Sequence, residues 1–369
     1  DTILTIGCAM IFMKVIEGSG ALDALSSLII EKFHRFPAVL LVLIMLIIMF
    51  PGMITGSSTA AVLSAGSIMA PVLALMGIDA VTSGSIIAMG ALLGMIAPPV
   101  NTAALIICAG IDVPYVGFEG PLALITFPLA ILFVLLLGYK QARHMDYEKL
   151  KPALEKQDAI RKQYGVRIYI PLLVLVALMV IFKVLKLGED IGMPLMFLIS
   201  AAVGLFTGKK INVLTAVPEA IRTAAPVMGI LMGVGMFIEV MTATGVRGLV
   251  VISCLRLPST LWLLACAISI PLFGAVSSYG ACSVLGVPFA YIYASLLGGN
   301  SVVVLAAISL IAAVGDMMPP TALAGLFAAQ VTGVEKYTEI LKRCIVPIII
   351  LLVYACFFLA NSKLIAGLF

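Results

Sequence analysis

Two short polar segments interrupt long apolar runs in this sequence: Ser57-Ser58-Thr59 (the first tip) and Ser277-Ser278-Tyr279 (the second tip). Serine and threonine hydroxyls are small, neutral oxygen donors, which suit a hard cation such as Na⁺ and can also hydrogen-bond a carboxylate. Neighbouring glycines let the backbone come close to a ligand. The two tips are therefore the first candidates for a binding site.

Each tip is followed at nearly the same distance by a Pro-Pro pair. From Ser57 to Pro98 is 41 positions, and from Ser277 to Pro319 is 42. Two consecutive prolines remove two N–H donors and clash with the preceding turn, so a helix must break there. A broken helix inside a membrane persists only where it is packed in protein or lines a wet cavity. The matched spacing predicts an internal repeat with a ligand region in each copy.

The ends of broken helices offer two kinds of ligand. Half-helix N-termini present N–H groups to carboxylate oxygens, whereas half-helix C-termini and unwound backbone present carbonyl oxygens to Na⁺. We expect a substrate site drawn from Ser57, Ser58, Thr59, Asn101, Thr102, Ser277, Ser278 and Thr321. We expect one Na⁺ site per repeat, with ligands from Ser57, Ser58, Pro98, Asn101, Ser278, Gly280, Gly315, Asp316 and Pro319. Because serine, glycine and proline also serve packing in membrane helices, the prediction rests on the duplication.

Three charged residues lie close to these elements. Asp316 precedes the second Pro-Pro pair by three positions. An acid at membrane depth is a functional candidate, which could bind Na⁺ or carry a proton. The alternative interpretation is structural: Asp316 lies near the cytoplasmic end of its helix, or its carboxylate is paired with a buried hydrogen-bond donor. Lys14 and Glu239 each lie six positions before a glycine, Gly20 and Gly245. We interpret these two as side chains that reach the membrane interface.

The composition is that of a membrane protein. The chain has 369 residues, of which 63% are hydrophobic and 11% are charged, whereas soluble domains carry about 25% charged residues. Several apolar runs approach the roughly 20 residues that cross a bilayer, among them 121–138, 169–185 and 346–360. The sequence therefore predicts an all-α polytopic membrane protein embedded in lipid. Asp1 lies inside an apolar segment without a start methionine, which predicts that one or more helices precede this chain.

Enzyme chemistry and nucleic-acid binding find little support. No HExxH zinc motif is present, His34 and His144 are far apart, and none of the seven cysteines forms a CxxC pair. The net charge of +4 carries no nucleic-acid signature. We predict a protein that is not an enzyme. Paired hairpins and broken helices favour alternating access over a permanent pore.

Charge placement predicts the topology. Residues 140–167 contain eight Lys/Arg and four Asp/Glu, which marks this loop as cytoplasmic by the positive-inside rule. The apolar run 37–50 has only fourteen residues, which is short for a span and indicates a re-entrant half-helix. Counting spans outward from the loop, the first hairpin opens to the cytoplasm and the second to the exterior. The two repeats are then inverted, as in many secondary transporters.

The chain is expected to divide into three parts. The first inverted repeat covers 1–139, with an arm helix over 21–35, a hairpin over 37–76 and a broken helix over 82–110. A basic cytoplasmic linker and scaffold helices occupy 140–223, where 211–223 is expected as a separate amphipathic helix. The second repeat covers 224–369, with an arm helix over 246–257, a hairpin over 258–297 and a broken helix over 301–332.

Several motifs resemble the large membrane (M-type) subunit of tripartite ATP-independent periplasmic (TRAP) transporters, within the wider ion-transporter superfamily. They are Gly56-Ser57-Ser58-Thr59-Ala60, Gly66-Ser67-Ile68-Met69-Ala70-Pro71, Gly94-Met95-Ile96-Ala97-Pro98-Pro99, Gly315 with Met318-Pro319-Pro320, and Gly325-Leu326-Phe327. The resemblance covers essentially the whole chain. By position, Ser57, Ser58 and 98–102 correspond to the family's first Na⁺ and substrate region. Ser277, Ser278 and 315–321 correspond to the second.

The resemblance implies an elevator mechanism, in which the hairpins and broken helices slide against a scaffold and are driven by inward Na⁺ flux. It also implies two partners: a periplasmic binding protein that delivers an organic acid, and a small membrane (Q-type) subunit that extends the scaffold. The implied location is the inner membrane of a bacterium or archaeon. The chain departs from the family pattern at Val100-Asn101, Met318, Asp316 and Lys14, which leaves the substrate and the ion stoichiometry open.

We therefore expect a sodium-coupled importer of a small carboxylate. One alternative is a single-component sodium–dicarboxylate symporter, although the hairpin tips of that class usually read Ser-Asn-Thr. Another is a membrane scaffold subunit that does not transport. No arginine lies in either tip or Pro-Pro break to clamp a carboxylate, so the backbone or the partner protein is expected to recognise the acid.

Overall fold

The computed structural model describes residues 2–143, 160–185, 192–256 and 258–369, and all regular structure in them is helical. Six of the described helices are long and apolar enough to cross a membrane, and the number rises to seven if the bent pair formed by residues 3–19 and 21–33 is one span. The predicted all-α polytopic fold is confirmed. Part of the predicted basic linker, residues 144–159, lies outside the described residues.

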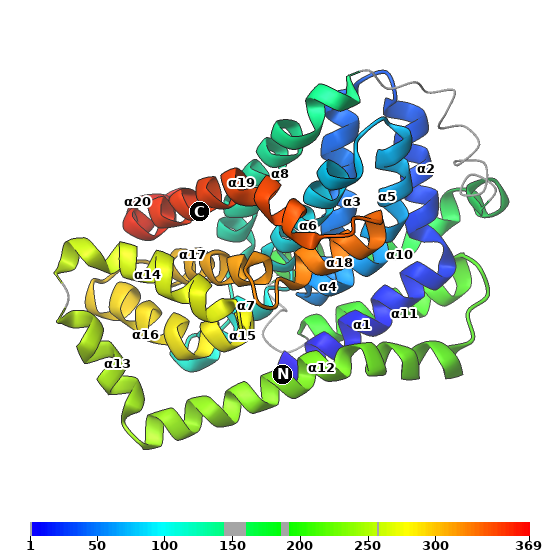
Figure 1. The fold of residues 1–369 in the computed structure, drawn as a ribbon. Helices are drawn as coiled ribbons and strands as arrows, with labels where there is room; N and C mark the ends of the chain where they lie inside the picture. The colour runs from blue at the N-terminus through cyan, green and yellow to red at the C-terminus, as the bar shows by residue number, and fades with distance from the viewer. Residues whose placement is uncertain (1, 144–159, 186–191, 257) are drawn as a thin grey trace.

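The first part of the chain contains an arm, a hairpin and a broken helix (Figure 1). Its elements are α1 (Thr2–Ser19), α2 (Ala21–Phe33), α3 (Pro37–Thr55), α4 (Ser58–Ala61), η1 (Val62–Gly66), α5 (Ser67–Leu75), α6 (Ala80–Ile96), α7 (Thr102–Gly110) and α8 (Glu119–Ala142). After the linker come η2 (Gly165–Tyr169), α10 (Ile170–Leu185) and α11 (Met193–Thr207). Helices α3 to α5 form the first hairpin, and α6 with α7 forms the first broken helix.

The second part follows the same order of elements. They are α12 (Val213–Ala243), α13 (Val246–Leu255), α14 (Ser259–Gly274), α15 (Ser278–Ala281), η3 (Cys282–Gly286), α16 (Val287–Ala290), η4 (Tyr291–Leu296), α17 (Ser301–Ala313), η5 (Val314–Met317), α18 (Leu323–Thr332), α19 (Tyr337–Ala360) and α20 (Ser362–Ala366). Elements α14 to η4 form the second hairpin, and α17, η5 and α18 form the second broken helix.

Local features recur at equal positions in the two parts. A proline inside each incoming hairpin arm, Pro51 and Pro271, lies six residues before the first serine of its tip. A π-helical turn begins five residues after that serine, at Val62 and at Cys282. Both Pro-Pro peptide bonds are cis. Single π-helical turns often mark functional sites, so the recurrence draws attention to the tips beside them.

Two expectations about helix length are wrong. Helix α3 has 19 residues and passes through the buried Pro51 to Thr55, so it is long enough to span, and the fourteen-residue argument for a re-entrant arm fails. Packing from neighbouring helices can hold a proline inside a membrane helix. The separate amphipathic helix predicted for 211–223 is absent, because α12 runs unbroken for 31 residues, about 46 Å at 1.5 Å per residue. It crosses the boundary drawn at residue 224, since no glycine or cap stops a helix there.

Helices α3 and α6 approach each other at a pair of glycines. A Cβ at Gly94 would lie 2.5 Å from the Met49 carbonyl oxygen, and a Cβ at Gly52 would lie 2.8 Å from the carbonyl carbon of Gly94. The second part repeats the contact, since a Cβ at Gly315 would lie 2.4 Å from the carbonyl carbon of Gly274. Gly94 and Gly315 each precede their Pro-Pro pair by four residues. The missing side chains let each hairpin arm lie directly against its own broken helix.

Buried apolar side chains form separate clusters. The largest gathers both hairpins and both broken helices with α8 and α19. A second cluster joins α1, α2, α10 and α11 and also contains Ile54 of α3 and Val100 at the first break, and a small third one joins α1 to α12. In Figure 1 the long α12 runs along the lower edge of the molecule, beside α1 and away from α6 and α18. The hairpins and broken helices thus share one core, and α1, α10, α11 and α12 flank it.

The glycine contact yields a test of this packing. We expect Gly94→Ala to lower the melting temperature, because the added methyl group would clash with the backbone of Met49, and overpacking of this kind typically costs about 1–3 kcal/mol. Thermal unfolding in detergent, followed by the fluorescence of the single tryptophan, Trp262, measures the effect. The matched control is Gly229→Ala in α12, where an added Cβ has no neighbour within 4 Å. Equal melting temperatures for the two variants would contradict the close approach.

Candidate functional site

The two hairpin tips meet at one carboxyl group. The Ser278 hydroxyl donates to Asp316 Oδ1 at 2.7 Å, and the Ser58 hydroxyl donates to Asp316 Oδ2. All three side chains are buried, with Asp316 only 4% exposed. The second serine of each tip therefore binds a different oxygen of the same carboxyl group, although Ser58 and Asp316 are 258 positions apart.

The first serine of each tip explains why the second one reaches Asp316. Ser57 and Ser277 are the N-cap residues of α4 and α15, where their hydroxyls accept hydrogen bonds from the amides of Ala60 at 3.3 Å and Gly280 at 3.1 Å. An N-cap hydroxyl satisfies one of the free N–H groups at a helix start. The cap also sets the direction of the first helical turn. The residue that follows the cap, Ser58 or Ser278, is the first residue of that turn. Ser57 and Ser277 therefore orient the tips.

Asp316 is placed by the break of its own helix. It lies in the 3₁₀ turn η5, which ends α17 just before Met318 and the second Pro-Pro pair. Its neighbour Gly315 lies against Gly274 at the end of α14. This contact brings the end of the second hairpin arm to the carboxyl group. A carboxylate with two hydroxyl partners is an all-oxygen donor set, which fits a hard cation such as Na⁺.

A direct hydrogen bond also joins the two tips. The Tyr279 hydroxyl donates to the Gly56 carbonyl oxygen at 2.7 Å. Gly56 ends α3 with a φ of 64°, in the left-handed region that favours glycine. A Cβ at this position would also lie 2.1 Å from Thr102 Oγ1. The Thr102 hydroxyl faces Tyr279, yet it is buried and makes no hydrogen bond of ordinary length and angle, so it could serve a bound ligand.

The predicted ligand Asn101 lies at the first break, but its side chain already has protein partners. Its Nδ2 donates to Ser309 Oγ at 2.9 Å, and its Oδ1 accepts from the Ala104 amide at 2.9 Å. Its own amide donates to the Tyr115 hydroxyl at 3.2 Å, which in turn donates to the Pro99 carbonyl at 3.1 Å. Asn101 thus caps α7 and links the two broken helices through Ser309 of α17.

Each break is bound to its own hairpin through the backbone. The Val100 amide donates to the Met53 carbonyl at 3.1 Å, and the Thr321 amide donates to the Ala275 carbonyl at 3.3 Å. The Thr321 hydroxyl donates to the same Ala275 carbonyl at 2.8 Å. These contacts hold the ends of the hairpin arms at the breaks.

The predicted site residues therefore fall into two groups. Those brought together around the tips are Ser57, Ser58, Asn101, Thr102, Ser277, Ser278, Gly280, Gly315, Asp316 and Thr321. Thr59 and Pro98 are half-buried, and Pro319 is exposed. No contact of the described residues places these three at Asp316.

Sequence reasoning missed three members of the site: Tyr279, Ser309 and Tyr115. Tyr279 stands where the first tip has Thr59, and that difference between otherwise matching tips was a usable signal. Ser309 lies inside an ordinary apolar segment, and Tyr115 lies in the short loop between α7 and α8. Nothing in their spacing indicates that they bind Asn101.

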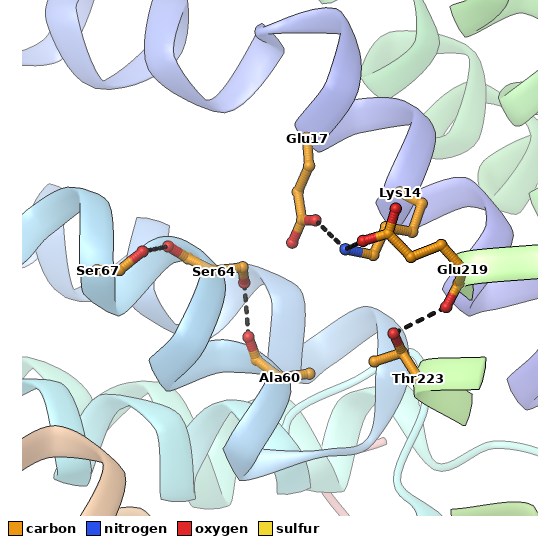
Figure 2. A network of polar contacts seen from close by, with 7 residues as sticks. All are labelled: Lys14, Glu17, Ala60, Ser64, Ser67, Glu219 and Thr223. Carbon is orange, nitrogen blue, oxygen red and sulfur yellow. Dashed lines mark hydrogen bonds and ion pairs between the residues drawn. The ribbon is translucent and has the colours of Figure 1, made fainter. Parts of the chain in front are cut away.

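Lys14 belongs to a separate ion-pair cluster. Its Nζ lies 3.3 Å from Glu17 Oε2 and 3.2 Å from Glu219 Oε1 (Figure 2). The cluster links α1 to α12. The nearby hydroxyls of Ser64 and Ser67 in Figure 2 instead donate to backbone carbonyls of the first hairpin. Glu239, the counterpart of Lys14 in the second part, is exposed.

Comparison with known proteins identifies the family. The family model for the tripartite ATP-independent periplasmic transporter, DctM component, matches residues 1–362. No curated protein sequence matches the chain. Among solved structures, the Alcanivorax borkumensis YdaH transporter, whose crystal structure has an unusual topology, is similar in fold, with a TM-score of 0.63 at 14% identity over 98% of this chain and 85% of that one. Because the family model matches almost the whole length, the chain belongs to the DctM component family of TRAP transporters.

Proposed function

We propose that this chain is the large membrane component of a Na⁺-driven TRAP importer of small organic acids. The observation that carries the proposal is the Asp316 carboxyl group, buried between the hydroxyls of Ser58 and Ser278. An ionised carboxylate inside an apolar protein needs a compensating positive charge. Both hydrogen-bond partners of Asp316 are neutral hydroxyls, so a bound Na⁺ would supply that charge. An inward Na⁺ gradient would then drive uptake.

Movement would follow the elevator scheme. The hairpins and broken helices share the largest core, which supports their moving as one body that includes Asp316. Helices α1, α10, α11 and α12, whose buried side chains belong to other clusters, would form the scaffold. The arm helices α2 and α13 would connect the two bodies. Inversion of the two repeats would give the site equivalent access from either side of the membrane.

The organic acid would bind beside the tips. The Thr102 hydroxyl is buried without a regular hydrogen bond, and it opens helix α7, whose N-terminal N–H groups favour a carboxylate. Recognition by hydroxyls and backbone suits a site that contains no arginine in either tip or break. A periplasmic binding protein would select and deliver the acid, and a small membrane subunit would pack on the scaffold in the inner membrane.

Uptake into proteoliposomes tests the proposal. The chain would be reconstituted with its small membrane subunit, and labelled pyruvate, succinate and gluconate would be offered with and without the periplasmic binding protein. We expect uptake of at least one acid that requires both an inward Na⁺ gradient and the binding protein. Uptake without the binding protein would indicate a single-component symporter. Absence of uptake under every condition would indicate a scaffold subunit.

Asp316→Asn tests the role of the carboxylate. The change keeps the shape and removes the negative charge, so we expect the initial rate of Na⁺-driven uptake to fall by about tenfold or more, since interactions with a charged group are worth about 1.5–3 kcal/mol. Ser67→Ala is the control, because the exposed Ser67 hydroxyl donates only to the Ser64 carbonyl, and it should leave the rate unchanged. Normal Na⁺-driven uptake by a folded Asp316→Asn variant would show that the ion binds elsewhere.

A further inference from the structure

We propose that the two tips share a single coupling-cation site, centred on the Asp316 carboxylate, in place of one site in each repeat. The inference rests on the proposed Na⁺ coupling and concerns its stoichiometry. Ser58 comes from the first hairpin and Ser278 from the second, and each donates to its own oxygen of Asp316. A cation at this carboxylate would therefore have hydroxyl ligands from both halves of the chain.

The first half has no acid in the equivalent place. Asp316 lies three residues before Pro319, and the residue three before Pro98 is Met95. Met95 is buried, with 1% of its surface exposed, and a thioether is a poor ligand for a hard cation. A second cation at the first break would have to be held without a carboxylate.

The carbonyl at the end of the first hairpin arm already has a donor. A half-helix C-terminus attracts a cation, and the Gly56 carbonyl just beyond α3 is one of the oxygens that would do so in the first half. This oxygen accepts the Tyr279 hydroxyl at 2.7 Å. Thr59, which occupies the same place in the first tip, is too short for such a bond. The neutral Tyr279 hydroxyl thus takes up hydrogen-bonding capacity of a carbonyl oxygen that a cation would otherwise use.

Two further polar groups near the breaks, the Asn101 side chain and the Ala275 carbonyl, also have protein partners. Both ends of the Asn101 amide have protein partners, Ser309 and Ala104. In the second half the Ala275 carbonyl accepts both the amide and the hydroxyl of Thr321. Asp316 is therefore the one acid of the described residues to which both tips donate, and the site for a coupling cation belongs to the two repeats jointly.

Direct binding of ²²Na⁺ to the purified chain in complex with its small subunit counts the sites. We expect one Na⁺ per chain, lost in Asp316→Asn. Ser58→Ala and Ser278→Ala should each weaken this same binding step by about tenfold. The control is Ser67→Ala in the first hairpin, whose exposed hydroxyl donates to the Ser64 carbonyl. It should bind Na⁺ like the unmodified chain.

A double-mutant cycle decides whether the serines act on one ion. For a shared site, Ser58→Ala and Ser278→Ala should alter one binding constant with non-additive effects, a result that does not depend on Asp316→Asn remaining folded. Two Na⁺ per chain, or two binding steps each sensitive to a different serine, would overturn the shared site and leave Na⁺ coupling intact. No ²²Na⁺ binding by the unmodified complex would overturn both.

Discussion

The Asp316 carboxyl group lies buried between two hairpin tips that come from opposite halves of the chain. Burial of a carboxylate costs several kcal/mol unless hydrogen bonds and a compensating charge accompany it. Ser58 and Ser278 supply the hydrogen bonds, and both must approach the same group to do so. The surrounding structure therefore has to hold two hairpins and a broken helix in a fixed relation at this point.

The same devices in both halves maintain that relation. Ser57 and Ser277 cap the short helices after the tips and set their direction. Gly94 and Gly315 remove the side chains that would separate each hairpin arm from its broken helix. The side chains at matching positions differ, because the first half has Met95 where the second has Asp316, and Thr59 where the second has Tyr279. Matching local features in the two halves thus carry different side chains at these positions.

The difference between the side chains of the two halves matters for how such a protein could couple the binding of an ion to movement. Among the hydrogen bonds that cross between the halves, three join the hairpins and broken helices of one half to those of the other: Ser58 to Asp316, Tyr279 to Gly56, and Asn101 to Ser309. The hairpins and broken helices that they join supply most of the large core. Anything that binds at Asp316 therefore acts on both hairpins at once. Membership of the DctM family of transporters gives that arrangement a transport context.

The amino-acid sequence by itself determined the helical membrane class, the two polar tips, the two breaks and the kinds of polar side chain near them. These follow from hydropathy, proline sterics and spacing, all of which act over short stretches of chain. It did not determine that α3 continues through Pro51 or that α12 continues past residue 224, because packing by distant helices decides where a marginal helix stops. Nor did it reveal that Ser58 would meet Asp316, or Asn101 would meet Ser309. Spacing says what a segment can bind, whereas only the packing of the two halves decides which side chains face one another.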